Sequence, residues 1–488
     1  MLGVGTTSAA GQSAEAWTQF QGDGAHVGFA SDAVAPPYRP AWRFDPGLAG
    51  RFGVSPPVVA GDLAVTVGPR AVYGVELTTG EAAWEIPRAY GPSVAPAIAT
   101  GGSGDVLIYS EGYGARPPRQ AYASGTPTPS ASAPAAPSPS TGTSDASDDG
   151  EAATDTRVVA VDLATRKPLW DAAVELPAVS RTGVTIDGDT AYVGDDDGIV
   201  TAIEVSTGDV RWTFDAPGPV STAIAAAGGS VVLSTQPEQD EPAVVIALAA
   251  ADGSESWRFG ETSGPFVASI PVISGDTVYL GFLDAAGSRL RALALEDGAE
   301  RWARAVTSQL SYLTVPIVTS DAVYAIDVSG QVHAVSPSSG EELWDYAINA
   351  FVPRAVPALA SGTLLVPTSR GSLLAIDTES HDLVARTAAT GPQGHLGALA
   401  VTPTVIVAVK GGHRPGLVAF DHDDGTALVS QPSPTVLDPG TMIANFAVAA
   451  LPVLLLLALA GRWLRRRIGP AFADEEEPGG VVDAGIDP

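Results

Sequence analysis

Three consecutive carboxylates in the middle of the chain are the first candidates for chemistry. Asp195, Asp196 and Asp197 stand immediately before Gly198, and carboxylate oxygens are the ligands that calcium prefers. Their spacing does not follow the alternating acidic positions and distal glutamate of a helix-loop-helix calcium site. Aspartate and glycine are also the preferred residues of a hairpin turn. The sequence therefore favours a turn over a calcium site at this position.

A second group, near the C-terminal end, combines histidine with carboxylates. Its members are His413, Asp421, His422, Asp423 and Asp424. They do not have the spacing of known histidine and carboxylate metal motifs such as H-E-x-x-H, so we expect a polar loop and a turn. No nucleophile elbow, phosphate-binding loop or dinucleotide-binding glycine pattern occurs in the chain. We therefore predict no catalytic, cofactor-binding or metal-binding residue.

Composition excludes further classes of function. The net charge is −29, and the sequence has no basic stripe that could displace counterions from phosphates. Binding to nucleic acid is therefore not expected. The chain has no cysteine, which excludes disulfides, zinc thiolate sites, iron–sulfur clusters and cysteine nucleophiles. With 488 residues, 45% of them hydrophobic, the chain can bury a large core.

A thirteen-residue phrase, VTAIEVSTGDVRW at Val200 to Trp212, organises most of the sequence. Its first part alternates apolar and polar residues as a half-buried strand does. Ser206 to Asp209 supply turn residues, and the alternation then resumes as a second strand. Thr190 to Gly194 predicts a further strand upstream. The unit is therefore a short antiparallel meander.

The phrase is repeated along the chain. A glycine followed four residues later by tryptophan occurs at Gly80/Trp84, Gly208/Trp212, Gly253/Trp257, Gly298/Trp302 and Gly340/Trp344. Trp170 lies in the same phrase with Arg166 in the glycine position, and two later copies, Leu373 to Ala385 and Leu417 to Val429, lack the tryptophan. From Trp170 onward the copies recur every 41 to 45 residues, which is the period of a four-stranded propeller blade. A large indole at one place in each repeat is suited to fill the gap between neighbouring blades.

The phrase A-[IVL]-[DE]-x-x-[TS]-G-x-x-x-W resembles the tryptophan-docking repeat of the pyrroloquinoline quinone (PQQ)-like β-propellers, and the resemblance covers about Trp42 to Val429. Trp17 to Gly28 resembles the lead-in that precedes the first blade in that family. The implied fold is all-β, an eight-bladed propeller of four-stranded antiparallel blades, with seven blades as the alternative. Ala41 to Phe44 is expected to pair with the last repeat and close the ring. The implied blade-docking residues are Trp42, Trp84, Trp170, Trp212, Trp257, Trp302 and Trp344.

The resemblance leaves three functions open. The first is a non-catalytic binding or assembly scaffold for a cell-envelope protein or an extracellular ligand, as in the outer-membrane assembly lipoprotein of the family. The second is a PQQ-dependent oxidoreductase, but the chain lacks the cysteines of the vicinal disulfide in those enzymes and any segment resembling their acid and calcium motifs. The third is an extracellular ligand sensor. Because fold does not imply function, we favour the scaffold and expect no cofactor; PQQ with calcium would accompany only the second function.

Other segments flank or interrupt the propeller, which is assigned to residues 41–430. Residues 1–14 resemble the end of an export signal, and 15–40 are the lead-in. Residues 112–156 contain a Pro/Ser/Thr/Ala-rich tract with few large apolar residues, which predicts a disordered insertion within the second blade. Residues 431–441 form a linker.

Residues 442–461 are twenty residues without a charge, long enough to cross a bilayer. They predict one C-terminal transmembrane helix. The flank that follows is basic and aromatic: Arg462, Trp463, Arg465, Arg466 and Arg467. The positive-inside rule places these arginines and the tail, 462–488, in the cytoplasm and the propeller outside. The sequence thus predicts a single-pass protein of the cell membrane whose partners are the membrane and an envelope protein or extracellular ligand.

Overall fold

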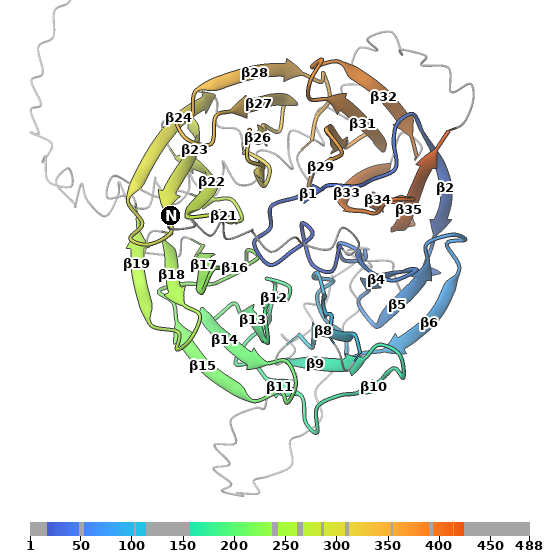
Figure 1. Cartoon of the computed structure of the whole chain (residues 1–488). Coiled ribbons are helices and arrows are strands. Elements are labelled where there is room, and N and C mark those ends of the chain that lie inside the picture. Colours follow the sequence, from blue (N-terminus) through green and yellow to red (C-terminus); the bar gives the residue numbers. More distant parts are fainter. Residues whose placement is uncertain are drawn as a thin grey trace, which may run out of the picture.

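The computed structural model describes residues 17–47, 53–101, 104–113, 156–236, 243–260, 267–284, 287–307, 312–352, 355–389, 394–412 and 414–423. Eight antiparallel sheets surround a central axis as the blades of a propeller (Figure 1). This confirms the predicted all-β, eight-bladed fold, and the seven-bladed alternative is wrong. Nowhere in these ranges does a helix have the length and apolar character needed to cross a bilayer. The predicted helix at 442–461 lies outside them, as do residues 1–16.

Each blade runs from an inner strand near the axis to an outer strand at the rim. Blade one contains β3 (Val58–Ala60), β4 (Leu63–Val67), β5 (Ala71–Glu76) and β6 (Ala82–Pro87). Blade two contains β7 (Ala97–Ala99), β8 (Val106–Glu111), β9 (Arg157–Asp162) and β10 (Lys167–Pro168), with β11 (Val174–Glu175) also paired to β9. Blade three contains β12 (Thr185–Asp187), β13 (Thr190–Gly194), β14 (Ile199–Glu204) and β15 (Val210–Asp215). Blade four contains β16 (Ala225–Ala227), β17 (Ser230–Ser234), β18 (Val245–Ala249) and β19 (Glu255–Phe259).

The second half of the ring repeats this pattern. Blade five contains β20 (Val267–Ala268), β21 (Val272–Ser274), β22 (Thr277–Asp284), β23 (Gly287–Ala294) and β24 (Glu300–Thr307). Blade six contains β25 (Ile317–Val318), β26 (Val323–Ile326), β27 (Gln331–Val335) and β28 (Glu342–Ala347). Blade seven contains β29 (Ala358–Ala360), β30 (Thr363–Pro367), β31 (Ser372–Asp377) and β32 (Leu383–Ala388), with β1 (Phe29–Ala30) on its inner edge. Blade eight contains β33 (Gly394–Val401), β34 (Ile406–Gly412), β35 (Gly416–His422) and, from the N-terminal part of the chain, β2 (Tyr38–Phe44).

The ring is closed by pairing between a strand from the N-terminal part of the chain and the last strand of the propeller sequence. Strand β2 pairs antiparallel with β35, from Tyr38 opposite His422 to Phe44 opposite Leu417. This confirms that the segment around Trp42 closes the ring, although the strand begins at Tyr38 rather than at 41. Since β2 occupies the outer edge of β35, Trp42 supplies the tryptophan strand of blade eight and the copy near Val429 is not needed to complete it.

The antiparallel meander gives the propeller two unlike ends. At one, which we call the turn end, the first strand of each blade turns into the second and the third into the fourth. At the other, the loop end, the second strand connects to the third and the fourth strand leads to the next blade. The predicted insertion belongs to the loop end, because it falls between β8 and β9. Of that insertion, residues 114–155 are outside the described ranges.

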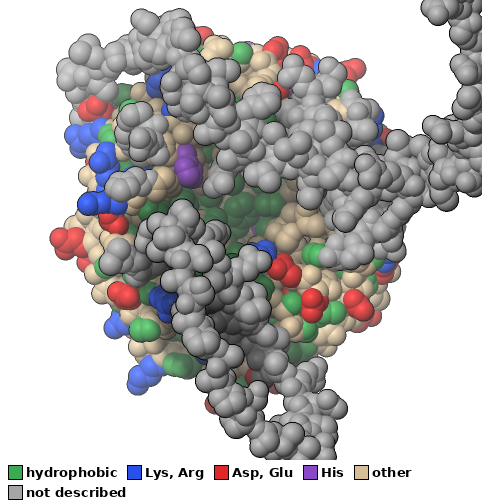
Figure 2. Space-filling model, turned by 180° about the vertical axis from the view of Figure 1, so that it is seen from behind, with side chains coloured by type: hydrophobic (Ala, Val, Ile, Leu, Met, Phe, Trp, Pro, Cys, Tyr) green, Lys and Arg blue, Asp and Glu red, His purple; other side chains and the backbone are tan. Residues whose placement is uncertain are grey.

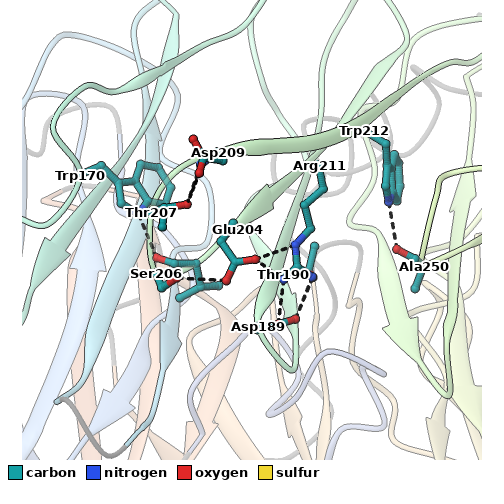
Figure 3. Close-up of polar contacts among 11 residues, drawn as sticks. Trp170, Asp189, Thr190, Glu204, Ser206, Thr207, Asp209, Arg211, Trp212 and Ala250 are labelled. Carbon is teal, nitrogen blue, oxygen red and sulfur yellow. Dashed lines mark hydrogen bonds and ion pairs between the residues drawn. The ribbon is translucent and has the colours of Figure 1, made fainter.

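Five tryptophans connect neighbouring blades in the same way. Each indole lies on the turn-end glycine of the next blade and donates its Nε1 hydrogen to a backbone carbonyl there; the side chains are only 6% to 9% exposed. The bonds are Trp42 to Leu77 (2.7 Å), Trp170 to Val205 (2.9 Å), Trp212 to Ala250 (2.9 Å), Trp257 to Leu295 (2.7 Å) and Trp302 to Pro337 (2.8 Å). Figure 3 shows two of these indoles beside the exposed ion pairs that Arg211 makes with Asp189 and Glu204. Glycine is needed because its φ is positive and a Cβ would enter the ring, for example 2.7 Å from Trp170 at Gly208.

The two remaining docking tryptophans, Trp84 and Trp344, do not lie opposite a glycine. Opposite Trp84 the glycine position is held by Arg166, and opposite Trp344 by His381; both adopt positive φ, +60° and +62°. Trp344 stacks on the His381 ring at 4.7 Å, whereas the buried Nε1 of Trp84 has no hydrogen-bond partner. Both indoles are only half-buried. A side chain in the glycine position thus prevents these two indoles from docking in the way that the other five do.

This difference predicts unequal effects of removing the indole nitrogen. Replacing Trp212 by phenylalanine should lower the free energy of unfolding by about 1–2 kcal/mol, because the partly buried Ala250 carbonyl loses its donor. The same change at Trp84 removes no hydrogen bond and should cost clearly less. Urea unfolding of the two variants measures the difference, and equal losses would contradict the docking role of the Trp212 nitrogen.

The lead-in forms an inner ring across the blades (Figure 1, dark blue). Seven inner strands each donate one backbone amide to it, from blade one to blade seven in order. The donors and acceptors are Val59 to Trp17 O, Ile98 to Thr18 O, Ile186 to Gln19 Oε1, Ala226 to Gly24 O, Ile273 to Ala25 O, Val318 to Val27 O and Leu359 to Gly28 O. In blade eight the direction reverses, with Val34 donating to Thr402 O. The edge of each inner strand that faces the axis has no neighbouring strand. The lead-in therefore supplies the hydrogen-bond acceptors that the backbone amides on this edge need.

Candidate functional site

The three central aspartates lie in the loop-end turn between β13 and β14. Asp195 is fully buried, and its carboxylate accepts the backbone amides of Ile199 (2.8 Å), Asp197 (3.1 Å) and Ala178 (3.2 Å). Burial raises its pKa, and these amide bonds oppose the shift. Asp196 pairs with Arg181 at 2.8 Å. Asp195 is thus engaged by the turn itself, and in the described ranges no three His, Asp or Glu side chains form a group that could hold a metal ion.

The predicted histidine group does not form one site. His422 and Asp421 end β35 at the turn end, whereas the loop that carries residue 413 precedes β35 at the loop end. A seven-residue strand places these ends about 20 Å apart. His422 Nδ1 contacts the Ala35 carbonyl at 2.9 Å, and Asp421 pairs with Arg39 at 2.9 Å. Both side chains fasten the closing strand, as Asp423 does through its amide to Pro37; His413 and Asp424 themselves lie outside the described residues.

The loop end carries the features suited to recognition. In Figure 2 its centre is hollowed and shows hydrophobic side chains, with charged side chains around the rim. Two parts of this end stand out from the repeat. One is an exposed row of two stacked tyrosines between two arginines on blades one to three, and the other is a pocket beside blade eight.

We call the row the arginine–tyrosine ladder; it consists of Arg70, Tyr90, Tyr113 and Arg181. The Arg70 guanidinium lies 5.1 Å from the centre of the Tyr90 ring, and that of Arg181 lies 5.9 Å from the Tyr113 ring. Between them the two tyrosine rings stack at 5.5 Å with an angle of 20°. Tyr90 and Tyr113 are 40% and 37% exposed. Two large aromatic rings are thus held at the surface between two cations.

Close backbone packing brings the two tyrosines together. Gly91 and Gly112, their chain neighbours, touch: a Cβ on Gly91 would lie 2.6 Å from the Gly112 carbonyl oxygen. Larger residues would push the two loops apart. The ladder therefore depends on two glycines that the repeat pattern does not contain.

A buried arginine and a buried glutamate fix the loops under the ladder. Arg88 donates to the carbonyls of Ser110 (3.1 Å) and Pro92 (2.9 Å). Burial lowers its pKa to about 10, while Glu111 opposes the shift. Glu111 accepts the Ala89 amide at 2.9 Å and pairs with Arg157 at 2.6 Å. These bonds hold the residues next to Tyr90 to blade two.

The second feature, the blade-eight pocket, has a volume of about 480 Å³. It lies where blade eight meets the loops that lead into blades seven and one. Its lining residues are Gly53, Val54, Pro56, Val356, His395, Gly397, Ala398, Val409, Lys410, Gly411, Gly412 and Pro415. Most of these are apolar or glycine, and His395 and Lys410 supply the polar side chains. This composition is typical of a small-ligand site.

Sequence reasoning did not select the ladder or the pocket. The ladder residues come from four separate loops, and His395 and Lys410 belong to neighbouring strands without a motif. One signal was present, since Lys410 is one of only two lysines in a chain that otherwise uses arginine. The membrane-anchor residues Arg462, Trp463, Arg465, Arg466 and Arg467 lie outside the described ranges, and their role stays a prediction.

Three solved structures were found to be similar to the chain. The chain is similar to a computationally designed protein, Ika8, with a TM-score of 0.56 and 13% identity over 78% of this chain and 99% of that one. It also aligns with BamB from Moraxella catarrhalis (TM-score 0.37, 20% identity, 53% and 87% coverage). A third match is the quinohemoprotein alcohol dehydrogenase ADHIIG from Pseudomonas putida HK5 (TM-score 0.46, 10% identity, 87% and 82% coverage). Only the likeness to Ika8 has a TM-score above 0.5, and it concerns the fold alone.

Sequence comparison identifies the family. No curated protein sequence matches the chain. One family profile, described as outer membrane protein assembly factor BamB, matches residues 154–330 and 328–451. The two matches begin in blade two and continue through blade eight, over more than half of the chain. This protein belongs to the PQQ-like propeller family of the outer membrane protein assembly factor BamB.

Proposed function

We propose that the protein is a membrane-anchored propeller outside the cytoplasm that acts as a non-catalytic binding or assembly scaffold for a cell-envelope protein. The observation that carries the proposal is the arginine–tyrosine ladder on the loop end. Membership of a family described as an assembly factor supports the same function. The uncharged segment 442–461 with its basic flank is the proposed anchor.

The ladder suits protein recognition for two reasons. Tyrosine and arginine are the residues that most often supply binding energy at protein interfaces, because a large rigid ring or a planar cation gains contact at little cost in conformational entropy. In the ladder the rings are already stacked, so less freedom is lost on binding. Arg181 is already paired with Asp196, so it is Arg70 that favours a partner segment with a carboxylate beside apolar side chains.

Copurification from native membranes tests the proposal. The full chain should retain an envelope protein at a fixed stoichiometry. Replacing both Tyr90 and Tyr113 by serine should reduce recovery of that partner by about tenfold or more, since two aromatic anchors are lost. The matched control replaces Val210 and Leu343 by serine; these residues are 48% and 51% exposed on the outer strands of blades three and six and should leave recovery unchanged.

Two results would overturn the proposal. One is recovery of the partner that is equal for the ladder variant and the wild type, which would remove the ladder from the binding surface. The other is tightly bound quinone with dye-reducing activity after incubation of the same sample with PQQ and calcium. That result would favour the oxidoreductase over the scaffold.

A further inference from the structure

The loop-end hairpin between the second and third strands carries an arginine in three consecutive blades, which adjoin one another at the right of Figure 1. In blade seven it is Arg370, between β30 and β31; in blade eight Arg414, between β34 and β35; in blade one Arg70, between β4 and β5. All three side chains are exposed. The equivalent hairpins of blades three and six carry aspartates instead, at Asp195 to Asp197 and at Asp327. The arginines therefore belong to one sector of the ring and not to the repeat.

We call Arg370, Arg414 and Arg70 the arginine arc. Within the described part of the chain none of the three forms an ion pair; the Arg70 guanidinium lies over the Tyr90 ring. Other blades pair such arginines with carboxylates, as at Arg181, Arg211 and Arg301. The charges of the arc are thus left for an anion from outside the described chain.

A fourth arginine, Arg43, lies beside the blade-seven end of the arc. Its guanidinium donates to the Ala389 carbonyl at 2.5 Å. The Ala389 amide in turn donates to the carbonyl of Gly371, the neighbour of Arg370, at 2.8 Å. A carbonyl does not neutralise a guanidinium, so Arg43 adds to the positive charge of this sector.

Few carboxylates oppose this charge. Burial lowers the pKa of Lys410, Asp45 raises it, and Arg43 and Arg414 lower it, so these charged groups lie around one position of blade eight. In the loop-end connections of blades seven, eight and one that the structure describes, Asp45 is the only acidic residue. Cations outnumber carboxylates here, although the whole chain carries a net charge of −29. The sector is therefore complementary to an acidic partner.

The spacing of the arc selects the form of that partner. Sheets packed face to face are about 10 Å apart, so the equivalent hairpins of neighbouring blades recur at about this distance. Three residues of an extended chain span about 9–10 Å. Every third side chain of an extended segment can therefore reach the next arginine, and guanidinium groups bind carboxylates through paired hydrogen bonds.

We propose that the arginine arc binds an extended acidic segment of a partner protein, with a carboxylate at every third residue. The course of the chain favours a protein over a lipid surface, because β35 ends at the turn end and the proposed anchor at 442–461 follows it. The chain thus leaves the described propeller from the end opposite to the arc. The inference rests on the proposed scaffold function and extends it, since Arg70 belongs to both the arc and the ladder.

Peptide binding to the full chain in phosphatidylcholine nanodiscs tests the arc and its spacing. The probe is a fluorescent peptide of repeated Asp-Pro-Ser triplets, in which proline favours an extended chain. Its isomer, with all the aspartates in one block, has the same charge and composition. Measured by fluorescence anisotropy, the triplet peptide should bind about fivefold more tightly than the isomer, and higher ionic strength should weaken its binding. Equal affinity of the two peptides, or no binding by either, overturns the proposal.

Substitutions locate the binding. Arg70→Gln, Arg370→Gln and Arg414→Gln combined should weaken binding of the triplet peptide by about tenfold or more, because charge-assisted hydrogen bonds are lost. The matched control changes the net charge equally on the outer strands of blades three, four and five, by Arg211→Gln, Arg258→Gln and Arg301→Gln. It should keep wild-type affinity. Equal weakening in the two variants would mean that net charge alone attracts the peptide, which also overturns the proposal.

Copurification of the native partner separates this inference from the scaffold function on which it rests. Loss of the partner both in the arc variant and in the variant with serine at Tyr90 and Tyr113 supports both. If the arc variant retains the partner and the serine variant loses it, the scaffold function stands and the arc inference is wrong. Cosedimentation of the wild type, but not of the arc variant, with added phosphatidylglycerol vesicles in the absence of peptide binding would assign the arc to a lipid surface and likewise overturn the proposal.

Discussion

Replacement of Trp42 by alanine is expected to lower the free energy of unfolding by about 3–5 kcal/mol, the usual cost of removing a buried aromatic side chain. Trp42 is on β2, the strand that closes the ring, and its indole lies on Gly80 of blade one. The substitution removes this contact between the first and last blades and leaves the Leu77 carbonyl without its donor. We therefore expect a larger loss than for a phenylalanine at Trp212, which keeps a ring in place.

Urea unfolding followed by tryptophan fluorescence and by circular dichroism measures this effect. Leu343→Ala is the control, because that side chain is 51% exposed on an outer strand and its loss should change stability by less than about 0.5 kcal/mol. If Trp42→Ala were no more destabilising than the control, the hydrogen bonds of β2 alone would close the ring and the indole would not contribute.

Acid should destabilise the propeller through His26 in the lead-in. This side chain is 1% exposed and packs edge-on against Phe20 at 5.5 Å. Burial lowers its pKa from 6.5 to about 4, and a hydrogen bond to the Pro271 backbone opposes the shift. The unfolded chain therefore binds a proton at higher pH than the folded one. The stabilisation is complete above pH 6.5 and is lost as the pH falls toward 4, by about 3 kcal/mol in all.

Unfolding free energies at pH 7.5 and pH 4.5 isolate the contribution of His26 when wild type is compared with His26→Asn. Asparagine tolerates the positive φ of this position, +63° in the structure. The loss of stability on acidification should be smaller in the variant by about 2–3 kcal/mol. Equal pH dependence of wild type and His26→Asn would mean that His26 becomes protonated without unfolding of the lead-in.

The repeated phrase made much of the fold predictable. Strand β13 has the predicted bounds, Thr190–Gly194, and the predicted hairpin at Val200 to Trp212 is formed by β14 and β15. The reason is that strand alternation and turn residues act over a few positions and recur in each blade. The turn at Asp195 to Gly198 followed from the same local chemistry.

Positions that deviate from the phrase needed the structure for their interpretation. Arg166 was visible as a missing glycine, but its effect is on Trp84, in the preceding blade. His381 similarly occupies the glycine position opposite Trp344. The loss of normal indole docking depends on contact between neighbouring blades, which cannot be predicted from the sequence of a single repeat.

The sequence alone therefore determined the class of fold, the repeat that forms each blade and the closure of the ring, because each of these follows from a local pattern repeated at a fixed period. The structure decided between eight blades and seven. Only the tertiary structure decided the path of the lead-in, which joins Gln19 to Ile186 across 167 positions. It also decided the ladder and the blade-eight pocket. These sites combine residues from separate loops and blades, and the physical reason is that side chains brought together by ring closure need no common spacing along the chain.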